Sequence, residues 1–234
     1  MFVGADANIN LYNFFYIGEI MNIHFTERMK AIASLFPKSE TAADIGADHG
    51  LLSIYLAREG LSDIVYACDI NEAPLNKAKE NIEKFSLSDK VIPVLSDGLS
   101  FAKDKAETVI IAGLGGDVIS YILKKDDISK IKCFILQPMS KAEVLRETLG
   151  EVNLKIEDEI LVSDMGRTYC IIKAVPGKEE YSPLELVAGP VVIKNKGEYF
   201  SEYATRLIRY EESRAKGENG EMHREIAEKL KEMI

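Results

Sequence analysis

Three aspartates, Asp44, Asp69 and Asp97, each close an apolar, strand-like run of the sequence. The first is followed by a turn that contains Gly46 and Gly50. Such a strand–turn–helix segment places backbone N–H groups and a helix N-terminus beside a bound ligand. An acid about 20 residues beyond a glycine turn is suited to accept hydrogen bonds from the two ribose hydroxyls of a nucleoside. The spacing therefore predicts an enzyme that binds a nucleoside cofactor.

The glycine turn also indicates which nucleoside. Dinucleotide enzymes place a second glycine where the pyrophosphate touches the backbone, whereas this chain has Asp48 there. A carboxylate at that position repels a pyrophosphate, which disfavours an NAD-dependent dehydrogenase. It suits a ligand without phosphate that carries a cationic amino group, and S-adenosylmethionine has that chemistry. The alternative is a structural turn with capping acids.

The neighbouring side chains have more than one possible role. Asp97, which precedes Gly98, is predicted to accept from the adenine amino group, or else to cap the next helix. Asn71 either orients Asp69 or forms the turn before a helix. His49 is a possible base near neutral pH, although it more often orients a loop or touches the ligand. The predicted cofactor-binding set is Asp44, Gly46, Asp48, His49, Asp69, Ile70, Asn71, Asp97 and Gly98.

Two further loops are candidates for the site of group transfer. Gly113, Leu114, Gly115 and Gly116 end the fourth strand-like run, where close approach to the reacting atoms favours glycine. The alternative is a turn that needs a positive φ. Gln137 and Pro138 end the fifth run and either contact an incoming base or form a structural turn. No side chain stands out as a catalytic base, and the sequence predicts no Ser/His/Asp arrangement or Walker loop.

The elements that must position these residues alternate along the chain. Strands are predicted at 41–45, 64–69, 91–95, 108–112 and 133–137, with helices at 25–36, 50–59, 73–85, near 98–103, at 116–125 and at 141–149. This alternation predicts a doubly wound parallel sheet. Two more runs, 157–163 and 168–175, are joined by a segment whose Gly166 suits a hairpin. A terminal antiparallel hairpin is typical of the seven-stranded, mostly parallel, Rossmann-like class I methyltransferase fold.

The character of the chain changes after Pro183. Residues 198–216 and 221–233 carry apolar side chains at helical spacing, and the second stripe is predicted to contain Met222, Ile226, Leu230 and Met233. Gly217 and Gly220 separate the two segments, which predicts an antiparallel helical hairpin. His24 and His223 show no partners in the sequence. The predicted domains are an extension at 1–20, a methyltransferase domain at 21–183 and the helical hairpin at 184–234.

Composition restricts the class of protein. The chain has 234 residues, 47% of them hydrophobic, and a net charge of −9, which argues against simple electrostatic adhesion to nucleic acid or an anionic membrane. Cys68, Cys133 and Cys170 lie singly in apolar runs and are predicted to be buried thiols, with no metal. Residues 1–20 contain no Lys or Arg, so a secretory signal is not expected, and Met21 is an alternative start. We expect a cytoplasmic protein that does not engage a membrane, with a monomer favoured.

The motifs together resemble the TrmK family of bacterial tRNA (adenine-N1)-methyltransferases. The similar segments are ADIGADHGLLSIYL (43–56), ACDINEAPL (67–75), SDGL (96–99), IAGLGGDVI (111–119), LQPMSKAEVLRETL (136–149) and the late AGP (188–190). The resemblance runs from Met21 to the C-terminus. Family members commonly have Asn after LQP, whereas this chain has Met139, so a polar role toward the target base is not expected at this position.

The resemblance implies methyl transfer from S-adenosylmethionine to N1 of the adenine at tRNA position 22. Because N1 of neutral adenine carries an in-plane lone pair, placement in line with the sulfonium suffices without a protein base. The atom lies on the pairing edge, so the base must be exposed or flipped. Candidate tRNA contacts on the hairpin are Arg206, Arg209, Arg214, Lys216 and Arg224, unless this is an ordinary solvated face or a self-association surface. The rival hypotheses are a small-molecule methyltransferase and a non-catalytic nucleotide- or tRNA-binding protein.

Overall fold

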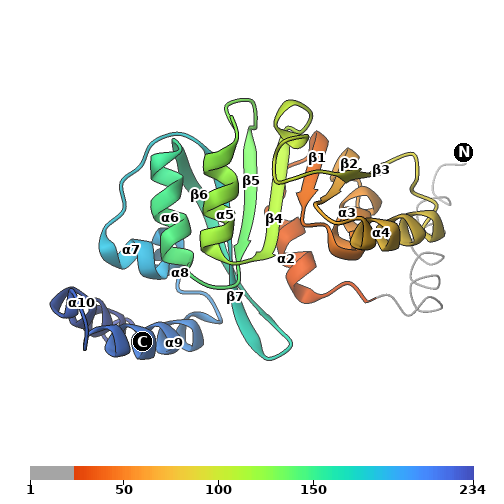
Figure 1. Ribbon diagram of the computed structural model, residues 1–234. Helices are drawn as coiled ribbons and strands as arrows, with labels where there is room; N and C mark the ends of the chain where they lie inside the picture. The colour runs from red at the N-terminus through yellow and green to blue at the C-terminus, as the bar shows by residue number, and fades with distance from the viewer. Residues whose placement is uncertain (1–23) are drawn as a thin grey trace, which may run out of the picture.

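The computed structural model describes residues 24–234, so the predictions for residues 1–20 and for a start at Met21 lie outside the described residues. Seven strands form one sheet: β1 (Ser39–Ile45), β2 (Ser62–Asp69), β3 (Val91–Leu95), β4 (Thr108–Leu114), β5 (Cys133–Pro138), β6 (Leu154–Asp164) and β7 (Arg167–Pro176). Their order is β3-β2-β1-β4-β5-β7-β6 (Figure 1). The predicted fold class is confirmed.

The strand order decides where the candidate residues meet. The first five strands are parallel, and β7 is antiparallel to both β5 and β6. The order reverses between β1 and β4, and a ligand crevice in such sheets lies beyond the carboxyl ends of the strands at this switch point. Because β7 runs antiparallel to β5, its first residues lie at the same edge of the sheet. The turn between β6 and β7 contains Gly166 at φ 73°, as the hairpin prediction requires.

Helices cover both faces of the sheet. One face carries α2 (Glu27–Leu35), α3 (Leu51–Arg58) and α4 (Glu72–Lys84), and the other carries α5 (Gly116–Lys125), α6 (Ala142–Glu151), α8 (Pro190–Asn195) and the start of α9 (Phe200–Arg214) (Figure 1). The other helices in residues 24–234 are α7 (Pro183–Ala188) and α10 (Gly220–Lys231). Two apolar cores result, one on each side of the sheet. Within the described part of the chain, no helix has the length and apolar character needed to span a membrane.

The predicted helix near 98–103 is wrong in part. The chain forms a turn there, followed by a single 3-10 turn, η2 (Ala102–Asp104). Leu99 and Ala102 anchor this segment in the core, so burial rather than helical hydrogen bonding fixes its path. The sequence reading also missed α7 and α8. Both are only six residues long, and each begins at a proline, with a Ser182–Glu185 capping box before the first.

The three cysteines are buried thiols, as predicted. Each lies in a strand with at most 4% of its surface exposed, and none forms a disulfide. Burial raises the pKa of Cys68 and of Cys170 to about 12 and that of Cys133 to about 11. These side chains act as small apolar core residues, because thiolate formation is suppressed.

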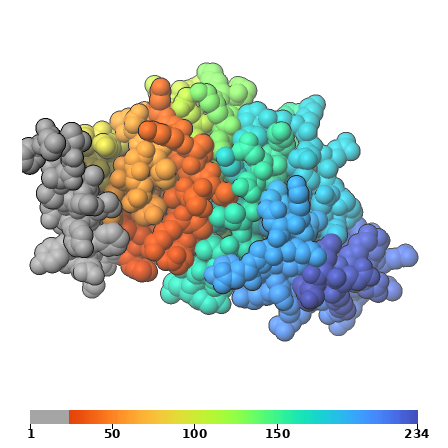
Figure 2. Space-filling model, turned by 180° about the vertical axis from the view of Figure 1, so that it is seen from behind, coloured from red at the N-terminus to blue at the C-terminus, as the bar shows by residue number. Residues whose placement is uncertain are grey.

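The helical hairpin formed by α9 and α10 is confirmed, although it shares the core of the sheet. Phe200 and Tyr203, in the first turn of α9, pack into the main core, and the hairpin's own apolar cluster is small. Figure 2 shows α9 and α10 as a lobe at the end of the molecule opposite α4. Met222, in the first turn of α10, is 39% exposed, so the buried part of the predicted stripe begins at Ile226.

The prediction that His223 has no partner is also wrong. Its Nδ1 lies 2.6 Å from Oε2 of Glu211, and both side chains are buried between α9 and α10. The two residues are twelve positions apart, and only the turn of the hairpin brings them together. His24, by contrast, is exposed.

A buried ion pair attaches α7 and α8, which precede the hairpin, to the sheet. Arg146 on α6 and Glu159 on β6 are both fully buried, and Nε of Arg146 lies 2.8 Å from Oε1 of Glu159. Arg146 also donates to the carbonyls of Leu186 and Val187 at the end of α7, and Glu159 accepts from the backbone N–H of Val191 at the start of α8. Burial works to lower the pKa of Arg146, but the charge of Glu159 holds it well above the usual value.

Gly189, between α7 and α8, lies directly against this ion pair. Its φ is 96°, and a Cβ at this position would lie 2.5 Å from Oε2 of Glu159 and 2.8 Å from Nη2 of Arg146. The AGP segment therefore requires glycine for both conformation and space. The ion pair and Gly189 together fix where α9 begins, and so which residues of α9 face the carboxyl edge of the sheet.

Candidate active site

The glycine turn after β1 is held by a buried aspartate. The side chain of Asp44 is 4% exposed and accepts a 2.8 Å hydrogen bond from Oγ of Ser53 on α3. Burial raises the pKa of Asp44 to about 6, an effect that the hydrogen bonds with Ser53 only partly offset. The buried hydrogen bond between Asp44 and Ser53 thus joins the end of β1 to α3 and holds the turn between them. Gly46, at φ 77°, has open space where a side chain would lie, so a ligand can approach its backbone.

Asp48 and His49 lie on the rim of this turn. Both side chains are at least half exposed, and Nε2 of His49 lies 3.1 Å from Oδ1 of Asp48. His49 has a φ of 59°, and its carbonyl accepts a 2.9 Å hydrogen bond from Nδ2 of Asn81 on α4. The sequence reading missed Asn81, because a side chain that caps a backbone carbonyl 32 residues away has no local signature. Because both side chains are exposed and pair only with each other among the described residues, the geometry supports ligand contact rather than proton transfer.

Asp69 lies at the centre of the predicted cofactor site. The carbonyl of its predecessor, Cys68, accepts from the backbone N–H of Gly46, and the carbonyl of Asp69 accepts from Ser96, next to Asp97. Three strand ends are therefore joined around it. Oδ1 of Asp69 accepts a 2.8 Å hydrogen bond from the N–H of Asn71, and no described residue donates to Oδ2. The turn orients the carboxylate and leaves one oxygen available for ribose hydroxyls.

Ile70 and Asp97 flank Asp69. Ile70 is 62% exposed, which is unusual for an isoleucine and places an apolar surface beside the carboxylate. Oδ2 of Asp97 forms an ion pair with Lys125 on α5, a partner that the sequence did not predict. The second carboxylate oxygen has no described partner and can still accept from an adenine amino group. Gly98 follows at φ 57°, and a Cβ at this position would lie 3.5 Å from Cγ2 of Ile122.

These residues fit S-adenosylmethionine. A buried acid supports an open glycine turn, a second acid offers a free oxygen to a ribose, and an exposed apolar side chain offers a surface to an adenine ring. All of them lie at the carboxyl edge of three adjacent strands, β1, β2 and β3. The predicted set is thus brought together, with Asp44 beneath the site and the others around it.

The transfer loop after β4 is joined to the loop after β5 by backbone contacts. The N–H of Gly116 donates to the carbonyl of Ser140 at 2.8 Å, and the N–H of Met139 donates to the carbonyl of Leu114 at 2.8 Å. A Cβ on Gly116 would lie 2.1 Å from the carbonyl oxygen of Lys141, so only glycine permits this approach. Gly113 differs, since it has a φ of 79° and open space around it, as expected where a substrate approaches.

Gln137 supports this junction from inside the protein. Its side chain is fully buried, and its Oε1 accepts from the N–H of Gly113 at 3.2 Å while its Nε2 donates to the carbonyl of Pro138 at 3.0 Å. It therefore positions Gly113 rather than lying open to a base. Met139 has polar neighbours, because Nη1 of Arg28 on α2 lies 3.4 Å from its sulfur. The sequence reading missed Arg28, which is far away in the chain.

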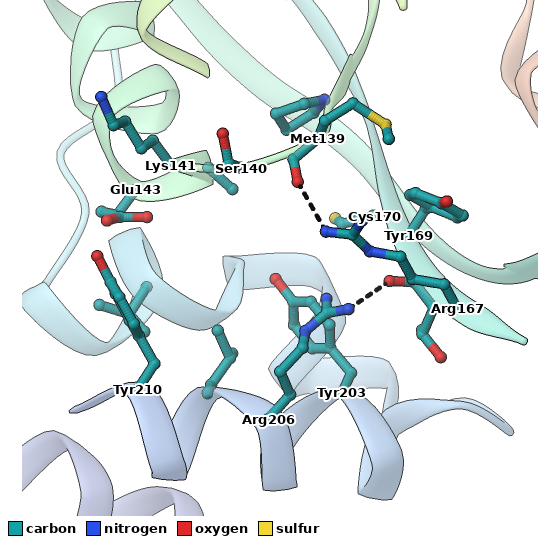
Figure 3. A pocket seen from close by; sticks show the side chains of 15 residues that line it. Met139, Ser140, Lys141, Glu143, Arg167, Tyr169, Cys170, Tyr203, Arg206 and Tyr210 are labelled. Atoms are coloured by element: carbon teal, nitrogen blue, oxygen red, sulfur yellow. Dashed lines mark hydrogen bonds between the residues drawn. The ribbon is translucent and has the colours of Figure 1, made fainter. Parts of the chain in front are cut away.

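A cavity of about 450 Å³ opens beside the loop after β5 (Figure 3). Residues 138–143 form one wall, the start of β7 forms another, and α9 closes the third side. Among the five predicted tRNA contacts only Arg206 lines this cavity. Arg214 faces Glu143 and Glu211, each at 3.7 Å. The side chains of Arg209, Lys216 and Arg224 are exposed and form no hydrogen bond or ion pair with any described residue. In residues 24–234 no three His, Cys, Asp or Glu side chains gather as metal ligands would.

Comparison with known proteins identifies the class. A family model described as a methyltransferase domain matches residues 25–172, which is more than half of the chain. The chain therefore belongs to this methyltransferase family. The matched range contains every predicted cofactor-binding residue and both transfer loops.

Relatives with a narrower description are also similar. The tRNA (adenine(22)-N(1))-methyltransferase of Bacillus subtilis (strain 168) is 29% identical over 200 residues, which cover 82% of this chain and 84% of that protein. The crystal structure of the B. subtilis m1A22 tRNA methyltransferase TrmK matches with a TM-score of 0.79 and 27% identity over 91% of this chain and 99% of that one. M. capricolum TrmK in complex with S-adenosyl-homocysteine matches with a TM-score of 0.74 and 30% identity over 89% and 96%. The chain is a member of the TrmK family, as the motifs predicted.

Proposed function

We propose that the protein transfers the methyl group of S-adenosylmethionine to N1 of the adenine at position 22 of tRNA. The names of the relatives support this reaction. The observation in this chain that carries it is the junction of two loops. A glycine loop with open space at Gly113 is joined to the loop after β5, and that loop opens on a cavity lined by arginines in a protein of net charge −9.

Each element of the site has a defined part in this reaction. Asp69 accepts from the ribose hydroxyls, Asp97 accepts from the adenine amino group, and the Gly46 turn contacts the methionine portion. When bound, S-adenosylmethionine supplies a methyl group activated by its sulfonium. Gly113, positioned by Gln137, lets the target base approach closely. Because the adenine N1 lone pair is available in the neutral base, the protein need only place it in line, which is an orientation effect.

The target atom lies on the Watson–Crick edge, so the adenine must leave any base pair before it can react. We propose that residues 21–183 bind the cofactor and that residues 184–234 contact the tRNA. Arg206 is the best-placed candidate, because it faces the cavity beside the transfer loops. Arg209, Arg214, Lys216 and Arg224 would contact the backbone farther along the hairpin. We further propose that the protein is cytoplasmic and acts as a monomer, and that it neither uses a metal ion nor engages a membrane.

The test is methyl transfer from labelled S-adenosylmethionine to two tRNA transcripts that differ only at position 22, with adenine or guanine. We expect incorporation into the adenine transcript alone. Equal incorporation into both transcripts would place the target elsewhere. Cofactor binding without incorporation into either would favour a small-molecule methyltransferase or a binding protein.

A further inference from the structure

Three arginines from distant parts of the chain meet at the end of the sheet: Arg28 on α2, Arg167 at the start of β7 and Arg206 on α9. The guanidinium groups of Arg28 and Arg167 lie 5.2 and 5.6 Å from the centroid of the Tyr169 ring. Nη2 of Arg167 donates to the carbonyl of Met139 at 3.3 Å, and Nη1 of Arg206 donates to the carbonyl of Thr168 at 2.8 Å (Figure 3). We call these three residues the arginine row.

The arginine row lacks acidic partners. No described carboxylate forms an ion pair with any of the three, whereas Arg146 and Arg214 both face glutamates. Glu202, which lies one turn before Arg206, accepts instead from the hydroxyl of Thr168 at 2.6 Å. Backbone carbonyls and aromatic rings thus fix the direction of the guanidinium groups without neutralising them. In a chain with nine more acidic than basic side chains, an uncompensated cationic row indicates an anionic ligand.

The cavity beside the row has the character of a nucleobase site. Its volume of about 450 Å³ is within the range of small-molecule sites, ~300–1,000 Å³. Val187 and Leu207 provide apolar surface, and the ring of Tyr210, which is 48% exposed, provides aromatic surface, whereas Tyr203 belongs to the buried floor. Figure 3 shows the rings of both tyrosines extending from α9 toward the loop after β5. Single-stranded nucleic acid is bound by this combination, with aromatic and apolar surface for bases and arginines for phosphates.

The cavity also adjoins the transfer loop through a backbone hydrogen bond of one wall residue. Met139 belongs to its wall, and the N–H of Met139 donates to Leu114 of the transfer loop. A nucleotide in the cavity would therefore lie next to the adenine being methylated. Building on the proposed function, we propose that the cavity and the arginine row bind a nucleotide adjacent to the target in the tRNA chain. Its base enters the cavity, its phosphate lies on Arg167 and Arg206, and Arg28 holds the next phosphate.

The phosphate contacts are tested by tRNA affinity at several salt concentrations for Arg28→Gln, Arg167→Gln and Arg206→Gln. Lys90→Gln is the matched control, because Lys90 is exposed at the amino edge of the sheet and its substitution removes the same charge. We expect each arginine variant to weaken tRNA binding about tenfold and to lower the salt slope by about 0.7 to 1. The affinity for S-adenosylmethionine should not change. Arginine variants that behave like Lys90→Gln would overturn the inference.

The base contact is tested with transcripts that carry an abasic nucleotide at position 21 or 23. We expect one of them to bind the wild-type protein more weakly than the intact transcript. In the variant Leu207→Trp the larger side chain fills the cavity. This variant should bind the intact transcript more weakly than the wild-type protein does, and it should bind the intact and abasic transcripts with nearly equal affinity. If the wild-type protein binds both abasic transcripts as tightly as the intact one, the cavity does not hold a neighbouring base. Loss of binding in the arginine variants, together with no methylation of adenine 22 by the wild-type protein, would support the RNA site and reject the proposed function.

Discussion

Replacing Gly116 with alanine should separate methyl transfer from cofactor binding. An added Cβ would lie 2.1 Å from the carbonyl oxygen of Lys141 and 2.8 Å from that of Ser140, whereas ordinary contacts begin near 3.4 Å. The transfer loop and the loop after β5 must therefore move apart by about 1 Å, which also weakens the hydrogen bond from Gly116 to Ser140. A displacement of this size at a reacting centre costs about 100-fold in rate.

The sign of the stability change makes this a demanding test. Gly116 begins α5, and glycine-to-alanine substitutions in helices ordinarily stabilise by about 1 kcal/mol. Here the overlap with backbone atoms should reverse the sign and destabilise by about 1–3 kcal/mol. Gly197→Ala is the control, since nothing lies within 4 Å of its Cβ position. The assays are single-turnover methyl transfer, calorimetric cofactor binding and thermal unfolding. A Gly116→Ala protein with the wild-type transfer rate would refute the assignment of this loop.

Three further predictions concern single side chains. Asp69→Asn should weaken S-adenosylmethionine binding at least tenfold, as measured by calorimetry, because the ribose hydroxyls lose a charged acceptor. The control Asp63→Asn, at the exposed amino end of β2, should leave this affinity unchanged. Arg146→Met should lower the free energy of unfolding in urea by about 3–5 kcal/mol, because Glu159 remains as an unpaired buried charge. Arg146→Met combined with Glu159→Leu should recover most of this loss. A double variant that is no more stable than Arg146→Met would contradict this account. Burial raises the pKa of Asp44 from 3.8 to about 6. Between about pH 4 and pH 6 the folded protein therefore retains a proton that the unfolded chain has lost. The free energy of unfolding contributed by Asp44 falls as the pH rises through this range. Relative to Asp44→Asn, the wild-type protein without cofactor should lose about 2 kcal/mol between pH 4 and pH 7. A pH-independent difference in urea unfolding would show that Asp44 is not protonated in this way.

The sequence predicted the sheet and the acidic strand ends because those features are local. Alternating strands and helices, with a glycine turn after an apolar strand, are readable within about ten residues. The strand order brings Asp44, Asp69 and Asp97 to one edge, as the parallel pattern requires. The glycine loop at 113–116 was recognised, with close approach or a positive φ as its alternative reasons, but which glycine needs which was not predicted. Gly113 needs a positive φ, whereas Gly116 needs space for the backbone of Lys141.

What the sequence did not provide are contacts between distant segments. Asp97 pairs with Lys125 and His223 pairs with Glu211, and in each case the packing of two elements decides the partner. The arginine row joins Arg28 to Arg167, 139 positions later, and arises because β7 returns antiparallel to β5. The short helices α7 and α8 escaped prediction because six residues carry too little periodicity. Their place follows instead from the buried Arg146–Glu159 pair.

The most direct test of the account is the identity and position of the methylated nucleoside. A tRNA transcript treated with the protein and S-adenosylmethionine would be digested to nucleosides for mass spectrometry, and a second portion would be read by primer extension. The account predicts 1-methyladenosine as the product, with reverse transcription stopping at position 22, because the lone pair at N1 is placed in line with the cofactor. Methylation on the exocyclic amino group, or a stop at another position, would contradict it.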